Sequence, residues 1–396
     1  MNGLKYILIS FSLLNIVSCS QFEPSAPNGN QVLDGPIEGL TTSEHKQFVN
    51  GDLAFNSQIF TVDNGLGPLF VATSCGSCHA GDGKGHPFTT LTRFGQTDET
   101  GNQFLNQGGP QLQNRAVPGF TPEQIPAGAT FSKFLPPANT GLGFLDAVSD
   151  SDIIAWADPT DANADGISGV PNWVAMKNYV DARPNSVVQN GKYIGRFGRK
   201  GSAYNLLQQT AQAYNQDIGV TSTYEAVETY SGSASDPEVS NQTLTDVVFY
   251  LKTLKAPVPR AETTEILSGK QLFTNVGCAN CHRPEMKTGV STIPALSDKT
   301  FYPYTDLLLH DMGAALDDGY TEGSAKTFEW RTTPLWGLGL SKNSQGGKYY
   351  LLHDGRANSI EDAILLHGGE GDSSKEKYKS LTDEEKKKLI LFLESL

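Results

Sequence analysis

The chain has 396 residues, of which 38% are hydrophobic. That length predicts two domains or slightly more, each large enough to bury its own core. The 43 acidic residues outnumber the 30 basic ones and give a formal net charge of −13; no basic stripe appears, which argues against a nucleic-acid partner.

The first residues are typical of an export signal. Lys5 precedes an apolar run, residues 6–17, that is too short to span a bilayer and resembles the apolar core of a signal peptide. Residues 16–19, Ile-Val-Ser-Cys, resemble a bacterial lipobox, so we expect residues 1–18 to be a lipoprotein signal peptide and Cys19 to carry lipid. The alternative is an ordinary signal peptide with an incidental cysteine. The protein is exported in both cases, and with lipid on Cys19 it is a membrane-anchored lipoprotein that faces the periplasm.

Residues 19–40 are rich in Pro, Asn, Gly and Gln and contain few large apolar side chains. This composition predicts a flexible tether. From about residue 41 onward the composition is that of a globular protein.

One short motif occurs twice and is the strongest signal in the chain. Residues 75–79 read Cys-Gly-Ser-Cys-His, and residues 278–282 read Cys-Ala-Asn-Cys-His. Two thiols at this spacing can form thioether bonds to one porphyrin, and the histidine that follows can bind its iron. The motifs predict two covalently bound c-type haems, attached through Cys75, Cys78, Cys278 and Cys281, with His79 and His282 as axial ligands. Disulfide hairpins or a single four-cysteine zinc site are the alternatives, but neither explains why both copies carry the histidine.

The features around the two motifs recur in the same order, which indicates an internal duplication. Each copy contains a later Gly-Leu-Gly turn and closes with an apolar helix, residues 244–254 and 383–396. In the second helix, Thr382 and Glu385 predict a capping box, and Leu389, Phe392 and Leu393 fall on one face. We therefore predict a mainly α fold of two tandem cytochrome c-like haem domains, residues 41–258 and 259–396.

The first copy is longer than the second. The segment from Gly141 to Phe249 is twice as long as the corresponding segment from Gly337 to Leu391. This difference predicts an inserted, loop-rich segment at about residues 150–237 in the first domain.

The insertion contains the beginning of an EF-hand-like loop. Asp161, Asn163 and Asp165 alternate, a glycine occupies the sixth position and Ile167 the seventh. The twelfth position is Asn172 instead of the usual glutamate, so a calcium site here would be weak or completed from elsewhere. The alternative is a turn rich in Asx residues that binds no metal.

Other short stretches resemble one known family. They are residues 82–85, 109–113, 165–169, 195–198, 310–313, 334–337, 352–356 and 367–370. In this order, together with the paired motifs, they resemble the di-haem oxidoreductase family from about residue 50 to the end. That family is related to the bacterial di-haem cytochrome c peroxidases and is sometimes labelled thiol oxidoreductase. The chain departs from the pattern at Arg199, where relatives often have tryptophan, and at Asp146, where they often have glutamate.

Methionine positions predict which iron has a sixth ligand. Met312 lies far enough beyond His282 to reach the opposite face of the second haem, whereas Met286 is too close. His310 is the rival ligand. The first haem has no methionine in the expected range, so we expect its distal side to be open, bordered by the proton-handling candidates Gln113, Glu123 and Asp146.

These observations predict an exported di-haem c-type oxidoreductase that is peroxidase-like. Electrons would enter at the C-terminal haem, and a small oxidant such as peroxide would react at the N-terminal haem. The electron donor would be a small redox protein or a quinol-linked protein, and the acidic surface would attract a basic donor. The alternative is a di-haem electron-transfer cytochrome without its own catalytic chemistry, and a third possibility is a binding protein in which the haems are structural.

Overall fold

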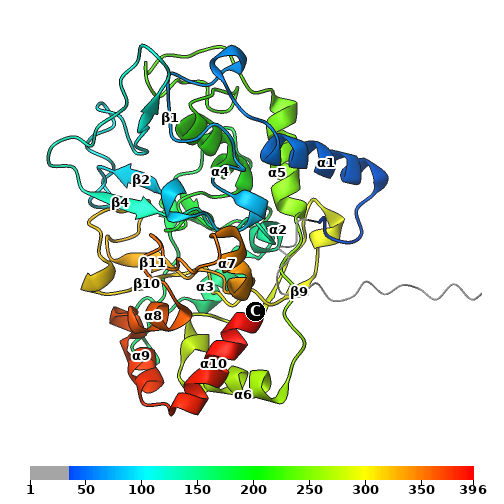
Figure 1. The fold of residues 1–396 in the computed structure, drawn as a ribbon, viewed down its shortest axis with the longest axis vertical. Coiled ribbons are helices and arrows are strands. Elements are labelled where there is room, and N and C mark those ends of the chain that lie inside the picture. Colours follow the sequence, from blue (N-terminus) through cyan, green and yellow to red (C-terminus); the bar gives the residue numbers. More distant parts are fainter. Residues whose placement is uncertain (1–34) are drawn as a thin grey trace, which may run out of the picture.

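The computed structural model describes residues 35–396, which form a mainly α-helical fold with small sheets (Figure 1). The α-helices in this part of the chain are α1 (Thr42–Asn56), α2 (Leu142–Asp146), α3 (Asp150–Trp156), α4 (Leu206–Ala213), α5 (Asn241–Thr253), α6 (Thr264–Asn275), α7 (Ser341–Ser344), α8 (Ile360–Leu365), α9 (Asp372–Lys379) and α10 (Asp383–Ser395). The predicted signal peptide, Cys19 and most of the predicted tether lie outside the described residues.

The strands are short and pair only in antiparallel fashion. They are β1 (Leu69–Phe70), β2 (Leu91–Phe94), β3 (Arg115–Ala116), β4 (Phe131–Phe134), β5 (Trp173–Val174), β6 (Val188–Gln189), β7 (Lys192–Ile194), β8 (Met286–Lys287), β9 (Thr300–Phe301), β10 (Leu309–Asp311) and β11 (Glu329–Arg331). The pairs are β1 with β3, β2 with β4, β8 with β9 and β10 with β11, and a three-stranded sheet has the order β5-β7-β6. Such small sheets fix loops but form no continuous layer.

Two helix pairs organise the ends of the molecule. Helix α1 packs on α5, and α6 packs on α10; in Figure 1 the first pair lies near the top and the second near the bottom. At each crossing a glycine allows close approach, since an added Cβ would lie 2.1 Å from the Asp246 carbonyl oxygen at Gly51 and 2.1 Å from the Lys388 carbonyl oxygen at Gly269. Both helix pairs therefore use a glycine to bring the two backbones close together.

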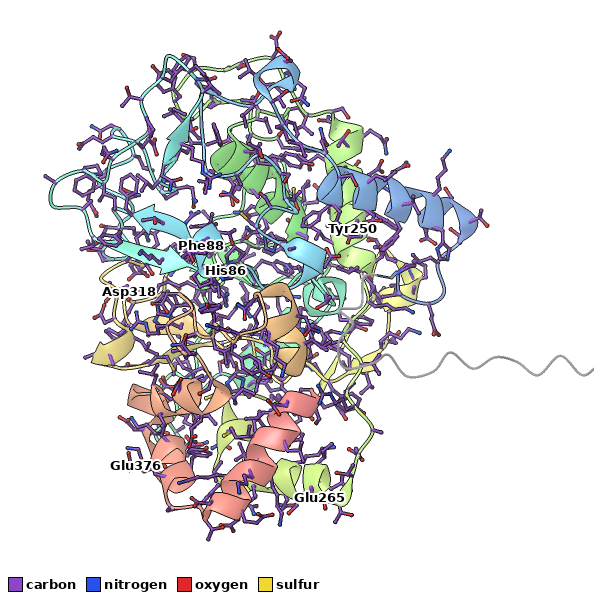
Figure 2. All side chains as sticks on the ribbon, in the orientation of Figure 1. His86, Phe88, Tyr250, Glu265, Asp318 and Glu376 are labelled. Carbon is purple, nitrogen blue, oxygen red and sulfur yellow. The ribbon has the colours of Figure 1, made fainter. Side chains whose placement is uncertain are left out.

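The sequence of the closing helices explains their packing. The capping box of Thr382 and Glu385 is confirmed at the start of α10, and the predicted apolar face is buried. In α5, Tyr250 lies against Phe48 and Phe55 of α1, with ring centroids 5.0 and 5.6 Å apart (Figure 2). Burying these large side chains stabilises the α1–α5 pair.

Three of the buried clusters matter for the functional sites. One surrounds α1, α4 and α5, and a second surrounds α6 and α10. A third combines Leu145, Ile153 and Ile194 with Met286 and Phe301. Because this cluster joins segments on both sides of the predicted boundary at residue 258, the two halves share apolar core.

The segment predicted as a loop-rich insertion is more ordered than expected. It contains α3, the three-stranded sheet and α4, and α4 contributes to the core around α5. The structure therefore does not set residues 150–237 apart from the rest of the first half. Within residues 35–396, no helix combines the length and the apolar character needed to cross a bilayer.

Candidate active site

Each Cys-x-x-Cys-His motif lines its own cavity. Cys75, Cys78 and His79 face the first cavity, and Cys278, Cys281 and His282 face the second. The cavities hold about 1750 and 1410 Å³ of space, respectively, including the parts that open to solvent. The structure therefore keeps the motifs apart, as two separate sites require.

The local backbone gives both motifs the same turn. The Cys75 carbonyl accepts hydrogen bonds from the backbone N–H groups of Cys78 and His79, at 3.1 and 3.0 Å. The Cys278 carbonyl accepts the corresponding bond from the N–H of His282 at 2.9 Å. This turn directs the cysteines and the histidine of each motif into one cavity. All four cysteines are free thiols, and no group of three or more His, Cys, Asp or Glu side chains in residues 35–396 could hold a metal ion, which argues against the zinc alternative.

Both histidines are prepared to bind a metal through Nε2. His79 Nδ1 lies 2.9 Å from the Pro137 carbonyl oxygen, and His282 Nδ1 lies 3.1 Å from that of Tyr304. A carbonyl can only accept, so the Nδ1 atoms carry the proton and leave the Nε2 lone pairs free. Burial lowers the pKa of each histidine to about 4, so both rings are neutral at neutral pH, as a ligand must be.

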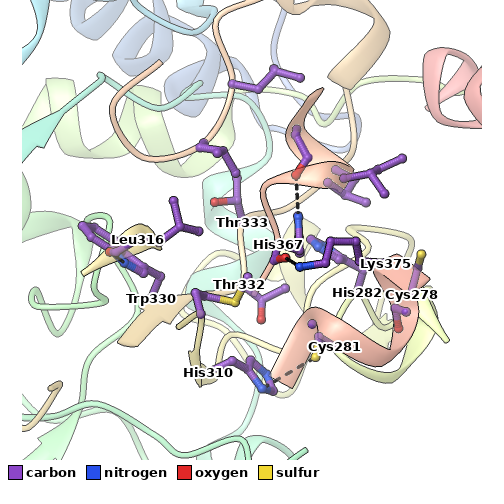
Figure 3. Close-up of a pocket in the computed structure, with 18 of the residues that line it drawn as sticks. Cys278, Cys281, His282, His310, Leu316, Trp330, Thr332, Thr333, His367 and Lys375 are labelled. Carbon is purple, nitrogen blue, oxygen red and sulfur yellow. Dashed lines mark hydrogen bonds between the residues drawn. The ribbon is translucent and has the colours of Figure 1, made fainter. Parts of the chain in front are cut away.

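The second cavity has a mainly apolar surface, and Figure 3 shows some of the residues that line it. Its lining includes Met312, Leu316, Trp330, Leu335 and His353. Met312 and His282 therefore line the same cavity. Met286 is 2% exposed in β8, is packed among apolar side chains and does not line this cavity.

His310, the rival ligand, is held by two carboxylates. Its Nε2 lies 2.8 Å from Asp306 Oδ2, and its Nδ1 lies 2.6 Å from Glu370 Oε2. Burial alone would lower the pKa of His310, but Asp306 and Glu370 outweigh it and hold the pKa well above its ordinary value. Both nitrogens of His310 are engaged by carboxylates, and His310 and Met312 both line the second cavity. Met312 as the sixth ligand stays a prediction.

The candidates predicted for the distal side of the first haem do not line the first cavity. The Gln113 side chain contacts the Gln216 carbonyl at 3.1 Å and Thr229 at 2.8 Å, and Glu123 accepts the Gln113 backbone N–H at 2.7 Å. Both therefore serve to fix loops. Spacing along the chain could not show that these side chains turn away from the cavity.

Asp146 forms a structural ion-pair cluster. Its carboxylate lies 2.8 Å from Arg183 and 3.2 Å from Lys252. Burial raises the pKa of Asp146, but Lys252 and Arg183 outweigh it and bring the pKa down to about 2. A carboxylate held in its charged form in this way is poorly suited to accept and return protons.

Sequence reasoning missed a polar group that does line the first cavity. It comprises Arg93, Gln216, Asp217 and Glu322. Arg93 lies 2.6 Å from Glu322 and donates to Gln216 at 3.1 Å. Burial raises the pKa of Asp217 to about 7, although Arg93 opposes this shift. The group joins β2, a π-helical turn (Tyr214–Ile218) and a loop before β11, so no local motif could have revealed it; the π-turn is the one structural signal that often marks a functional site.

The calcium candidates form a turn that satisfies its own backbone. The Asp161 and Asn163 side chains accept the Asp165 N–H at 3.0 and 2.9 Å, and Asp165 accepts the Ile167 N–H at 2.9 Å. Asn172 is 2% exposed, and its amide donates to the carbonyls of residues 200 and 322 instead. The structure therefore does not direct Asn172 toward the loop, and calcium binding by the remaining residues stays a prediction.

The chain matches one known family of proteins. The family described as "Di-haem oxidoreductase, putative peroxidase" matches residues 135–396, which include the second motif but not the first. No curated protein matches the chain. Among solved structures, hydrazine synthase of Kuenenia stuttgartiensis is 14% identical, with a TM-score of 0.41 over 99% of this chain and 100% of that one. A MauG-like protein associated with microbial copper homeostasis is 13% identical, with a TM-score of 0.40 over 94% of each chain. These structural likenesses are too weak to carry an argument, whereas the family match spans well over half of the sequence. The chain belongs to the di-haem oxidoreductase family.

Proposed function

We propose that the protein is an exported di-haem c-type oxidoreductase with a peroxidase-like reaction at the first site. The observation that carries this proposal is that two separate cavities each contain two thiols and a neutral histidine with a free Nε2. This donor set fits a covalently attached haem and its proximal ligand. The repeated helix pairs, each held by a glycine contact, support a tandem arrangement of two haem-binding halves.

The residues that would hold the two cofactors follow from the cavity linings. Cys75, Cys78 and His79 would hold one haem. The other would be held by Cys278, Cys281, His282 and, as sixth ligand, Met312. Bound haem would supply one-electron transfer at both sites and reaction with a small oxidant where an iron has an open side.

The residues that line the two cavities suggest different roles for the two haems. The second cavity offers Met312, and a thioether ligand suits a site that receives electrons. In the described part of the chain, the lining of the first cavity contains no methionine and no histidine other than His79. There, Arg93 would orient a small polar oxidant, and the Asp217 carboxylate would accept and return its proton.

The proposal is tested by spectroscopy of the purified holoprotein. Its mass should exceed that of the polypeptide by two haems, and the haem absorbance should survive denaturation. Electron paramagnetic resonance of the half-reduced protein should then show a high-spin iron that reacts with peroxide. If both irons are low-spin in the oxidised and half-reduced states and neither reacts, the protein is an electron-transfer cytochrome instead.

We also propose that the protein reaches the periplasm and is anchored to the membrane through lipid on Cys19. The lipobox-like residues 16–19 support this location, which also suits covalent haem attachment. The donor would be a small redox protein or a quinol-linked protein, attracted by the net charge of −13 if it is basic. Changing Cys19 to Ser should release the protein from membranes, and an unchanged membrane fraction would argue for an ordinary signal peptide.

A further inference from the structure

Three cations lie in the partition between the two cavities. Lys84, Arg199, Arg331 and Thr333 line both cavities at once. Arg199 and Arg331 are 6% and 9% exposed, and Lys84 is half-buried. The Arg331 backbone N–H donates to the Arg199 carbonyl at 3.3 Å, so the two arginines belong to adjoining segments. We call Lys84, Arg199 and Arg331 the cationic partition.

The two arginines of the partition donate to backbone carbonyls within the protein. Arg199 Nε donates to the Leu135 carbonyl at 2.8 Å, and Arg331 donates to the carbonyls of Gly198 and Thr332 at 3.2 and 3.1 Å. None of the three cations forms an ion pair with a carboxylate in residues 35–396. Asp354 and Asp306 offset part of the charge from a greater distance.

Three other buried or half-buried arginines each form an ion pair with a carboxylate. Arg93 pairs with Glu322, Arg183 with Asp146, and Arg196 with Asp150. The structure therefore supplies a carboxylate for each arginine that lies elsewhere in the interior around the first cavity. The cationic partition differs from these arginines because it has no carboxylate partner in the described part of the chain.

The cationic partition is energetically unfavourable unless an anion compensates for its charge. Burial, together with Arg199, lowers the pKa of Lys84 to about 7; burial, together with Arg331, lowers the pKa of Arg199 to about 9; and burial lowers that of Arg331 to about 10. A charge buried without a partner is destabilising, and three neighbouring cations also repel one another. Buried cations that face two cavities therefore indicate an anionic ligand on each side.

We propose that the cationic partition binds the carboxylate groups of both haems, so that one set of side chains acts on both reduction potentials. This inference rests on the proposed function, because a haem supplies two carboxylates in addition to its iron. Thr333, which also faces both cavities, offers a hydroxyl donor beside the cations. The first cofactor thereby acquires an electrostatic link to the second.

The sign of the effect follows from charge. Oxidation adds a positive charge to a haem, and a nearby cation in a medium of low dielectric constant disfavours that state. The partition therefore raises both potentials. Removing one of its cations should lower both, even though each haem is attached to a different half of the chain.

The test is a spectroelectrochemical titration of the holoprotein. Arg199→Gln and Arg331→Gln should each lower the reduction potentials of both haems. Arg199→Lys keeps the positive charge, so its two potentials should stay close to those of the wild type. Lys375 supplies the matched control because it lines only the second cavity, so Lys375→Gln should leave the first haem unchanged. If Arg199→Gln does not retain both haems, Lys84→Gln, which removes a half-buried charge, provides the same comparison.

The outcomes separate this inference from the proposed function. A variant that carries two covalent haems but shifts one potential, or neither, contradicts a shared partition. A wild-type protein whose mass shows no covalent haem contradicts the proposed function itself.

Discussion

The ring of His353 stacks on the indole of Trp330, with ring centroids 3.6 Å apart and planes inclined by 11°. Lys200 Nζ lies 3.9 Å from the centre of the same indole, and His353 Nε2 lies 2.8 Å from Asp318. Lys200 also donates to the carbonyls of residues 326, 327 and 329 at 3.1, 2.9 and 2.6 Å. The stack forms part of the lining of the second cavity and gives that apolar side a fixed shape.

Replacing Trp330 with Leu should destabilise the protein. The change removes the ring stack, the cation–π contact and the hydrogen bond from Nε1 to the Leu316 carbonyl. Truncation of a buried tryptophan to alanine costs about 3–5 kcal/mol, and leucine keeps part of the apolar volume, so the loss should be smaller than that. The melting temperature of the holoprotein should still fall measurably in calorimetry. Phe88→Leu is the control, because Phe88 is 90% exposed; an equal loss in both variants would contradict the argument.

Replacing Met312 with Leu should change only the second haem. The two side chains are similar in size, so packing is largely retained, but the thioether is lost and the potential of that haem should fall. Potentiometry and electron paramagnetic resonance would report the change. Met286→Leu, in a buried site away from the cavity, should leave both haems unchanged. If the potential and the spectrum of the second haem are unchanged in Met312→Leu, Met312 is not its sixth ligand.

Replacing Asp146 with Asn should reduce stability in a pH-dependent way. Because Lys252 and Arg183 depress the pKa of Asp146 to about 2, its contribution is fully present above the ordinary carboxyl pKa and is lost as the pH falls from about 4 through about 2. The loss at pH 7 should be on the order of 2 kcal/mol, and thermal melts at several pH values would show it converging with wild type in acid. Asp181→Asn, at an exposed position, should leave the melting temperature at pH 7 unchanged, and Asp146→Asn should retain its reaction with peroxide.

Replacing Asp217 with Asn should slow the reaction of the first haem with peroxide. Positioned proton transfer contributes about 10²–10⁴-fold, and the wild-type rate should rise with pH through about 7 as burial holds the pKa of Asp217 there. Stopped-flow spectroscopy would measure both effects. Glu123→Gln, outside the cavity lining, is the control; if it slows the reaction and Asp217→Asn does not, the loop residues carry the proton.

Local pattern was enough to predict some of these features and not others. Helix α10 has a capping box and a regular apolar face, which are read from residues three or four apart, and both are present. The Cys-x-x-Cys-His turns are equally local. The contact between His310 and Glu370 could not be predicted from local pattern, because Glu370 lies 60 residues further along the chain.

The distal side of the first cavity shows the same limit. Gln113, Glu123 and Asp146 have suitable side chains at suitable positions in the chain, but each is used to hold a loop or an ion pair. Arg93 and Asp217 come together only because β2 and the π-helical turn meet in the folded chain. Residue type alone could not indicate which carboxylate faces the cavity.

The glycine crossings at Gly51 and Gly269 also determine which half of the protein a substitution would disturb. Each lies where a single added methyl group would press on a helix backbone, and each belongs to a helix pair beside only one of the two motifs. A substitution at one glycine should therefore disturb the packing of one helix pair and leave the glycine contact of the other pair intact. If the two halves take up their cofactors as proposed, a substitution at Gly51 or at Gly269 should lower the yield of one attached haem more than that of the other.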